Sequence, residues 1–308
     1  MPNPSLDPEI IISRLAYRPD FSTMIEITEP PKPPIPILAD RVSSLGMLDR
    51  FPPEIISILL CMLDMQSLAC FAGVSFLGNI SVQSQRAYQE LVTFAGPALW
   101  ALGKVGLIGV HSVADLHAAL RTEDCAACAQ YGAFLFLLNC ERCCWQCLYY
   151  NPLFRVVTQK DAGEYFGLSE QHVQCLPTLH VIPGQYGLPG NYPPKCRGLV
   201  VVSVKAARNL GLMVQGSTQN LAQAMASRCK SPKRRIMGQY LQQVPTVSQS
   251  RDLLFLPSQM DIASDEFFGV ASIPLPSVSK SGRVENGLCA QEVVAQLETG
   301  CRVMFPLE

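Results

Sequence analysis

"FPPEIISILLCMLDMQSLACFAGVSFLGNI", residues 51–80, decides how the first half of this chain folds, and Glu54 and Asp64 are its only charged residues. Its apolar residues recur at helical spacing. Pro52 suits the first turn of a helix, and Asp64 suits the position that caps the next one. We therefore expect two short helices here, followed by a third helical piece in "VSFLGNISVQSQRAYQELV", residues 74–92.

Three explanations account for so apolar a stretch: a membrane span, an internal helical hairpin, or a surface that another protein covers. A span needs about 20 predominantly apolar residues, and a charge at its centre costs roughly 2.5–3.5 kcal/mol. Asp64, Gln66 and Ser67 interrupt the middle, so we expect no span. Short helices cannot bury all of these side chains among themselves, and an uncovered apolar patch normally marks a protein interface.

The order of residues in "LDRFPPEIISILLCMLDMQSLACFAGVS", residues 48–75, resembles an F-box. The resemblance rests on Phe51-Pro52, Glu54-Ile55, Ile58-Leu59, Leu63-Asp64, Leu68 and Val74-Ser75. Phe51 replaces the more usual Leu, and Phe76-Leu77-Gly78 stands where basic and aromatic residues often occur. The resemblance implies a three-helix domain that docks on the Skp adaptor of a cullin–RING ubiquitin ligase. The implied partner-binding residues are Phe51, Pro52, Ile55, Ile58, Leu59, Leu63, Leu68, Phe71 and Val74.

The thirteen cysteines include two short-spaced pairs, Cys125-x2-Cys128 and Cys144-x2-Cys147, with 15 residues between them. This spacing is typical of a structural zinc site with four thiolate ligands. Such a site has no open coordination position, so it indicates a role in folding and not in catalysis. Cys140 and Cys143 offer an alternative second pair, and buried free cysteines are the alternative to any metal site.

A second resemblance favours Cys144 and Cys147 as the ligands. "RCCWQCL", residues 142–148, resembles an Arg-x-Cys-x2-Cys-Leu motif in a family of fungal F-box proteins. The segments "VVTQKDAGEYFGLSEQH" and "LPTLHVIPGQYG" further along also resemble that family, and the likeness spans about residues 45–215. "ENGLCAQEV", residues 285–293, lacks the Trp and the second Cys of a later family motif, so a second metal site is not expected.

The expected fold class is α+β, mainly helical in the N-terminal half. We expect a flexible Pro-rich segment at 1–44, the F-box at 45–92, a helix with the zinc module and a following segment at 93–190, and a mixed α/β region at 191–308. Within 93–190 we expect a loop and then a helix that starts at Ser112, and a short strand followed by a helix at 155–168. In the last region we expect irregular loops, a strand and then helices at 198–226, and a terminal helix around 289–298. The basic "RCKSPKRR", residues 228–235, falls in an expected loop at 227–250, either solvated, phosphate-binding or a nuclear localisation signal.

The net charge of −1 gives no general attraction to nucleic acid or membranes. No secretory signal is expected, so the cysteines would be reduced in the cytosol or nucleus. Four isolated histidines and the lack of a phosphate-binding loop give no support for an enzyme. The expected function is substrate recognition in a ubiquitin ligase, by a non-catalytic subunit that binds the Skp adaptor, one zinc ion and an unidentified protein. A zinc-ribbon nucleic-acid binder and a scaffold outside ubiquitin ligases are the alternatives.

Overall fold

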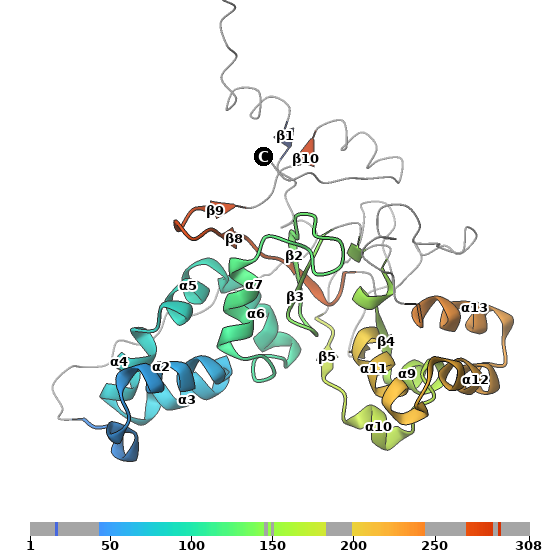
Figure 1. Cartoon of the computed structure of the whole chain (residues 1–308), viewed down its shortest axis with the longest axis horizontal. Helices are drawn as coiled ribbons and strands as arrows, with labels where there is room; N and C mark the ends of the chain where they lie inside the picture. Colours follow the sequence, from blue (N-terminus) through green and yellow to red (C-terminus); the bar gives the residue numbers. More distant parts are fainter. Residues whose placement is uncertain are drawn as a thin grey trace, which may run out of the picture.

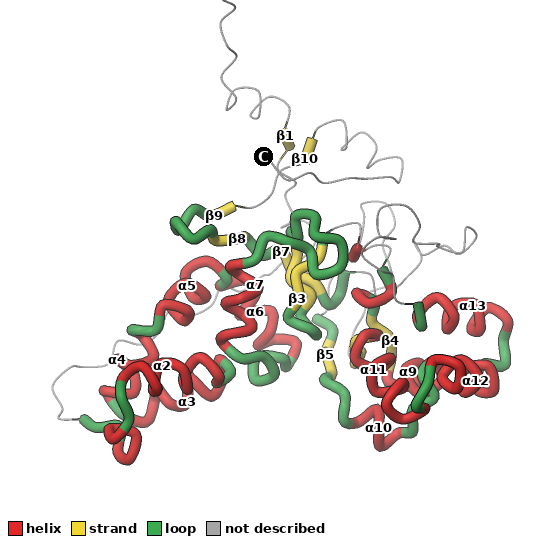
Figure 2. The backbone as a smooth tube through the Cα atoms, in the orientation of Figure 1, coloured by secondary structure: helices red, strands yellow, loops and turns green. Residues whose placement is uncertain are grey.

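The computed structural model describes residues 16–17, 43–144, 147–148, 151–182, 199–243, 269–285 and 289–290. These residues form eleven α-helices, two short 3-10 helices and four small antiparallel sheets (Figures 1 and 2). The α+β class with a mainly helical N-terminal half is confirmed. Nearly all of the segment 1–44 and of the helix expected at 289–298 lies outside the described residues. Strand β10 (Cys289–Ala290) pairs with β1 (Ala16–Tyr17).

The opening stretch forms helices as expected. After the 3-10 helix η2 (Gly46–Arg50) come α2 (Pro53–Met62) and α3 (Met65–Val74). Asp64 caps α3 by accepting a hydrogen bond from the backbone N–H of Ser67 at 2.8 Å. The single helical piece expected at 74–92 was wrong, because the chain forms α4 (Phe76–Gln83) and α5 (Arg86–Phe94). The break comes at Gln85, which is extended and uses its side-chain amide to bind the carbonyl of Ser81.

Two further helices follow, of which the first was expected to be a loop. Helix α6 (Gly96–Val105) opens with a proline in its first turn and closes at Gly106, which adopts a left-handed φ of 83°. Helix α7 (Val113–Arg121) confirms the expected helix, with Ser112 and Asp115 forming a capping box. These two helices complete the helical N-terminal part of the described chain.

An ion network ties α5 to α7. The carboxylate of Glu90 accepts from Arg86 Nε at 2.7 Å, from His117 Nε2 at 2.8 Å and from Arg121 Nη2 at 2.6 Å. Burial alone would raise the pKa of Glu90, but these hydrogen bonds and the charge of Arg121 lower it to about 2. Arg121 also donates to the carbonyl of Val278, which links the helices to a segment far along the chain.

The centre of the molecule is a three-stranded sheet, in the order β3-β2-β7. Strands β2 (Phe134–Phe136) and β3 (Glu141–Cys143) form a hairpin, and β7 (Ser272–Pro274) adds to the free edge of β2. The short pair β8 (Ser277–Val278) and β9 (Val284–Glu285) follows. One buried core runs from Leu60 of α2 through Phe136 to Val278, so helices, hairpin and the late segment fold together.

A second group of elements has its own buried core, which includes Phe166, Val202 and Leu221. Its sheet has the order β4-β6-β5. The expected strand and helix near 155–168 and the strand and helices at 198–226 are confirmed. The elements are η3 (Pro152–Phe154), β4 (Val156–Thr158), α9 (Gln159–Tyr165), α10 (Glu170–Gln174), β5 (Thr178–His180), β6 (Val200–Ser203), α11 (Val204–Gln215), α12 (Thr218–Arg228) and α13 (Pro232–Leu241).

The loop expected at 227–250 was wrong for residues 232–241, which form α13. Gly238 makes this packing possible, because a Cβ atom there would lie 2.9 Å from the side chain of Met225. Tyr240 and Leu241 are buried against the same core. Among the described residues, no helix is long and apolar enough to cross a bilayer.

Candidate functional site

Two turns of backbone present the four cysteines of the predicted site. In the first turn, the backbone carbonyl of Cys125 accepts from the N–H of Ala129 at 3.0 Å, and the N–H of Cys125 donates to the carbonyl of Gln130 at 2.6 Å. In the second, the N–H of Cys147 donates to the sulfur of Cys144 at 3.3 Å directly after β3. This is the folded knuckle that Cys-x2-Cys spacing predicts.

The four sulfurs of Cys125, Cys128, Cys144 and Cys147 all lie within 4.8 Å of one another. The sulfurs of Cys128 and Cys144 are 3.5 Å apart. Tetrahedral zinc at about 2.3 Å from each thiolate places the sulfurs about 3.8 Å apart. The cluster therefore has a geometry that could hold one metal ion. It is the single group of this kind among the residues that the structure describes.

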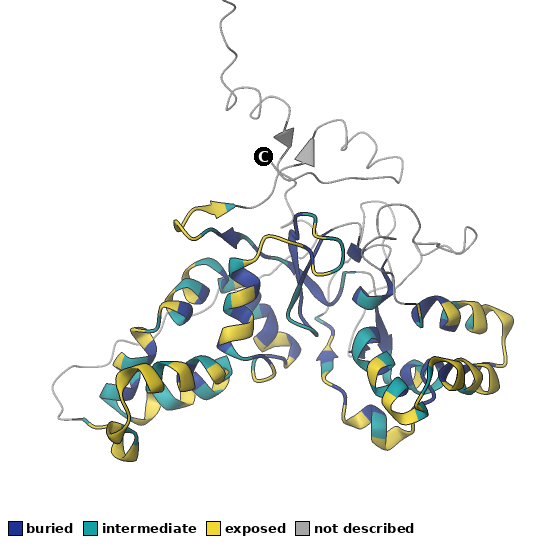
Figure 3. Cartoon of the chain, viewed as in Figure 1, coloured by how far each residue is buried: buried dark blue, intermediate teal, exposed yellow. Residues whose placement is uncertain are grey.

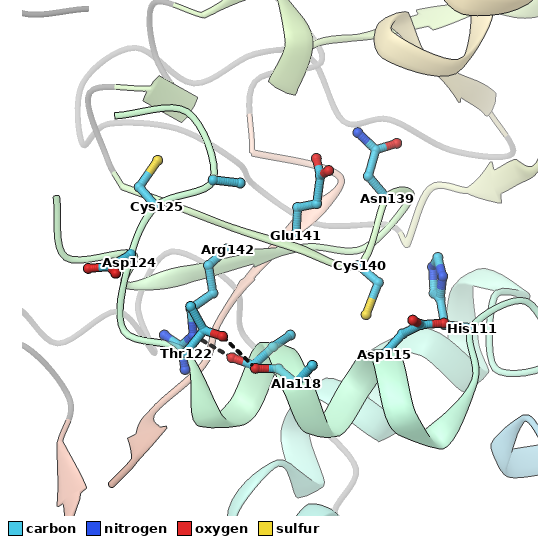
Figure 4. A pocket seen from close by; sticks show the side chains of 12 residues that line it. His111, Asp115, Ala118, Thr122, Asp124, Cys125, Asn139, Cys140, Glu141 and Arg142 are labelled. Carbon is cyan, nitrogen blue, oxygen red and sulfur yellow. Dashed lines mark hydrogen bonds between the residues drawn. The ribbon is translucent and has the colours of Figure 1, made fainter. Parts of the chain in front are cut away.

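The structure shows which of the two alternative cysteine pairs lies beside Cys125 and Cys128. Cys140 and Cys143 do not belong to the cluster. Cys143 lies in β3 and is completely buried. The sulfur of Cys140 points towards Asp115 and His111 at the end of a hollow opposite to Cys125 (Figure 4). Burial is the main reason why the pKa of Cys140 is raised to about 12, and the same cause holds the pKa of Cys143 above its usual range.

The thiols of the cluster interact strongly with one another. Hydrogen bonds from the other three thiols, that of Cys128 above all, hold the pKa of Cys125 well below its usual value. Once Cys125 is charged, its hydrogen bonds raise the pKa of Cys144 and Cys147 far above the usual value. The cluster cannot become four thiolates without a compensating cation, and metal binding supplies that charge while releasing protons.

Arg142 connects the cysteine turns to the rest of the core, and sequence analysis missed this role. Its carbonyl accepts from the N–H of Ala126 at 2.9 Å, next to the first knuckle. Its guanidinium is buried and donates to four backbone carbonyls. These belong to Ala119 at 2.6 Å, Leu275 at 3.0 Å, Gly132 and Pro276. No local signal in the sequence could reveal Leu275 and Pro276 as partners, because both stand more than 130 positions further along the chain.

A hollow of about 570 Å³ lies between α7 and β3, beside the cysteine cluster (Figure 4). Two of its polar groups have structural roles. His111 Nε2 bonds the carbonyl of Leu137 at 2.7 Å, and Asp115 belongs to the capping box of α7. The thiol of Cys140 faces His111 and Asp115 here, and because burial raises its pKa to about 12, it is protonated near neutral pH and is a weak nucleophile.

The second candidate site is an apolar surface on α2. Four side chains of its outer face are exposed, as is Phe51 just before the helix, and we call these five residues the α2 stripe: Phe51 (48%), Ile55 (41%), Ile58 (58%), Leu59 (43%) and Met62 (68%). Their spacing places them along one side of the helix. Figure 3 shows this face of α2 turned outward, while the inner face packs on the core through Leu60.

The other predicted partner-binding residues divide between surface and interior. Pro52 is exposed, and Val74 at the end of α3 is 81% exposed. Leu63 and Phe71 are half-buried and pack against the core. Leu68 has no exposed surface, since α3 turns it into the core, so it supports the helices from inside and offers nothing to a partner. Met62 was not among the predicted partner-binding residues.

Comparisons with protein families, with curated proteins and with solved structures find no match for this chain.

Proposed function

We propose that this chain is a substrate-recognition subunit of a cullin–RING ubiquitin ligase, with residues 45–92 acting as an F-box that docks on the Skp adaptor. The α2 stripe carries the proposal. Four large apolar side chains of α2, and that of Phe51 just before it, stand uncovered, and Glu54 is the only charged residue within α2. A folded protein normally leaves such a face open only for a partner.

The stripe is large enough to matter for binding. Complete burial of a large apolar side chain contributes roughly 1.5–3 kcal/mol. The five side chains are already about half covered, so each has about 1 kcal/mol left to gain on docking, or about 5 kcal/mol together. A helix that presents such anchors fits an apolar groove, where a few central residues dominate the affinity. Ile58 and Met62, the most exposed of the five, are the best anchors.

Zinc is the ion that we propose for the cysteine cluster. Four thiolates are soft ligands, and a closed tetrahedron of sulfurs suits zinc in a structural role. A bound zinc ion supplies a cross-link that contributes folding energy. Cys125 and Cys128 would hold it from one side, and Cys144 and Cys147 from the other, which fixes the hairpin β2–β3 in the core.

The proposed activity needs no catalytic residue in this chain. Holding a substrate near a ubiquitin-charged enzyme raises its effective concentration and makes the transfer intramolecular. The proposed location is the cytosol or nucleus, because thiols that bind zinc persist in a reducing compartment.

Co-purification with the Skp adaptor tests the proposal. We expect the wild-type chain to bind the adaptor in equal amounts and to carry one zinc ion per chain. Met62→Asp should abolish adaptor binding, because it places a charge in the apolar contact. Met213→Asp is the matched control, since Met213 is a helical methionine of similar exposure (74%) in the second core's α11.

A well-folded wild-type chain that ignores the adaptor would contradict the F-box proposal, as would equal loss of binding in both variants. Adaptor binding without association with the cullin would support a scaffold outside ubiquitin ligases instead.

A further inference from the structure

The charges of this chain are unevenly distributed, although the net charge is only −1. Residues 199–243 contain seven lysines and arginines and no aspartate or glutamate. Residues 43–144, which carry the α2 stripe and three of the cluster's cysteines, contain five basic and eight acidic residues. The second group of elements is therefore a local source of positive potential that the total charge conceals.

Internal contacts hold several of these basic residues close together, at the place where α9 meets the turn between α12 and α13. Arg234 pairs with Asp161 and, at 2.9 Å, with Glu164, both in α9. Its guanidinium also lies 5.1 Å from the centre of the Tyr165 ring. Arg228 at the end of α12 donates to the carbonyls of Gly163 and Leu168 at 2.8 and 2.7 Å. The turn is thus fixed on α9 (Figure 1).

We call this region the α13 basic surface, and its cations are Lys160, Arg228, Lys230, Lys233, Arg234 and Arg235. Two carboxylates, Asp161 and Glu164, lie among them, and both bind Arg234. Lys160, Lys230 and Lys233 are exposed and form no ion pair with any residue that the structure describes. The surface therefore has a surplus of positive charge on freely hydrated ammonium groups.

We propose that the α13 basic surface binds an acidic segment of the protein that the ligase recognises. This rests on the proposed function, because an adaptor subunit must hold a protein substrate. Charge complementarity selects an acidic partner. Ile236, which is 44% exposed on the same helix, adds an apolar contact for a peptide side chain.

Nucleic acid fits this surface less well than a peptide. Proteins that hold single strands stack the bases on exposed aromatic side chains. Tyr240 is the only aromatic residue in 199–243 and is 3% exposed, and Tyr165 below Arg234 is 6% exposed. The guanidinium of Arg234, which could form a bidentate contact with a base or phosphate, is already paired within the protein.

The test uses a fluorescent deca-glutamate peptide and the full chain in anisotropy titrations at low and moderate salt. We expect the wild type to bind the peptide, with an affinity that falls as salt rises. The double variant Lys230→Glu, Lys233→Glu should weaken binding by about tenfold at low salt, since exposed pairs contribute up to about 1 kcal/mol each. The control is Lys280→Glu, Arg283→Glu, which makes the same charge change at exposed positions of the β8–β9 pair.

The inference is overturned if the peptide does not bind at low salt, if the control loses as much affinity, or if a decanucleotide binds more tightly than the peptide. Adaptor binding is measured on the same proteins. The Lys230→Glu, Lys233→Glu variant should keep it, because the α2 stripe is intact. A wild type that binds the peptide but ignores the adaptor refutes the proposed function alone, and the reverse result refutes the α13 basic surface alone.

Discussion

Replacing Arg142 by lysine should destabilise the protein strongly, although the positive charge is kept. The guanidinium donates to carbonyls from three separate segments: Ala119 in α7, Gly132 before β2, and Leu275 with Pro276 after β7. A lysine has three N–H bonds on one nitrogen atom, so it cannot reach carbonyls that surround a planar fork.

The expected magnitude follows from the carbonyls left behind. We expect lysine to serve about two of the four, because its three N–H bonds diverge from one atom, and each buried acceptor without a partner costs about 1–3 kcal/mol. We expect Arg142→Lys to lower the free energy of unfolding by about 4 kcal/mol. For a chain of this size, the midpoint of thermal unfolding should fall by roughly 10 °C.

Urea and thermal unfolding measure the change, and chelator competition measures metal retention in the same samples. Arg86→Lys is the matched control, because its side chain is 69% exposed and makes a single surface pair with Glu90. It should change stability by less than about 0.5 kcal/mol. A loss below about 1 kcal/mol for Arg142→Lys would refute the role that we assign to these hydrogen bonds.

Three further predictions concern the cluster and the ion network. Cys144→Ser should remove the metal, whereas Cys140→Ser should keep one ion per chain. Elemental analysis of the purified variants measures the metal content, and an ion retained by both variants would refute the ligand set. Because the pKa of Glu90 is lowered to about 2, its contribution to stability is present above its unfolded pKa, near 4.5, and is lost as pH falls towards 2. When the free energy of unfolding is measured against pH, Glu90→Gln should therefore lose less stability between pH 4.5 and 2 than the wild type does. Identical stability curves for the two proteins would exclude the effect. Ala129→Gly should stabilise the protein by about 0.5–1 kcal/mol, because Ala129 has a left-handed φ of 56°. Thermal unfolding checks it, and a destabilised variant would show that the turn is not strained.

The cysteine site shows what sequence can establish. The spacing of Cys-x2-Cys pairs predicted a four-thiol site, because each pair needs only a local turn. It left Cys140 and Cys143 open as the second pair, and the family resemblance favoured Cys144 and Cys147, which the structure brings together with Cys125 and Cys128. The local patterns for α2, α3, α7 and α9 succeeded for the same reason. They failed for α13, where the basic residues concealed the apolar spacing of Met237, Tyr240 and Leu241.

Long-range structure was out of reach of local patterns. The pairing of β7 with β2 joins segments that lie far apart in the sequence, and nothing in either strand specifies the other. Likewise, the sequence showed Leu68 on an apolar helix but could not show which face of α3 turns inward. Burial depends on what packs against the helix, and that is a property of the whole fold.

Hydrogen–deuterium exchange of the chain, alone and with the purified Skp adaptor, tests the central claim most directly. We expect the adaptor to slow exchange in residues 51–74, which contain α2 and α3, and to leave α11 and α13 unchanged. Slower exchange confined to another part of the chain, or no change at saturating adaptor, would contradict the claim that the α2 stripe is a docking surface.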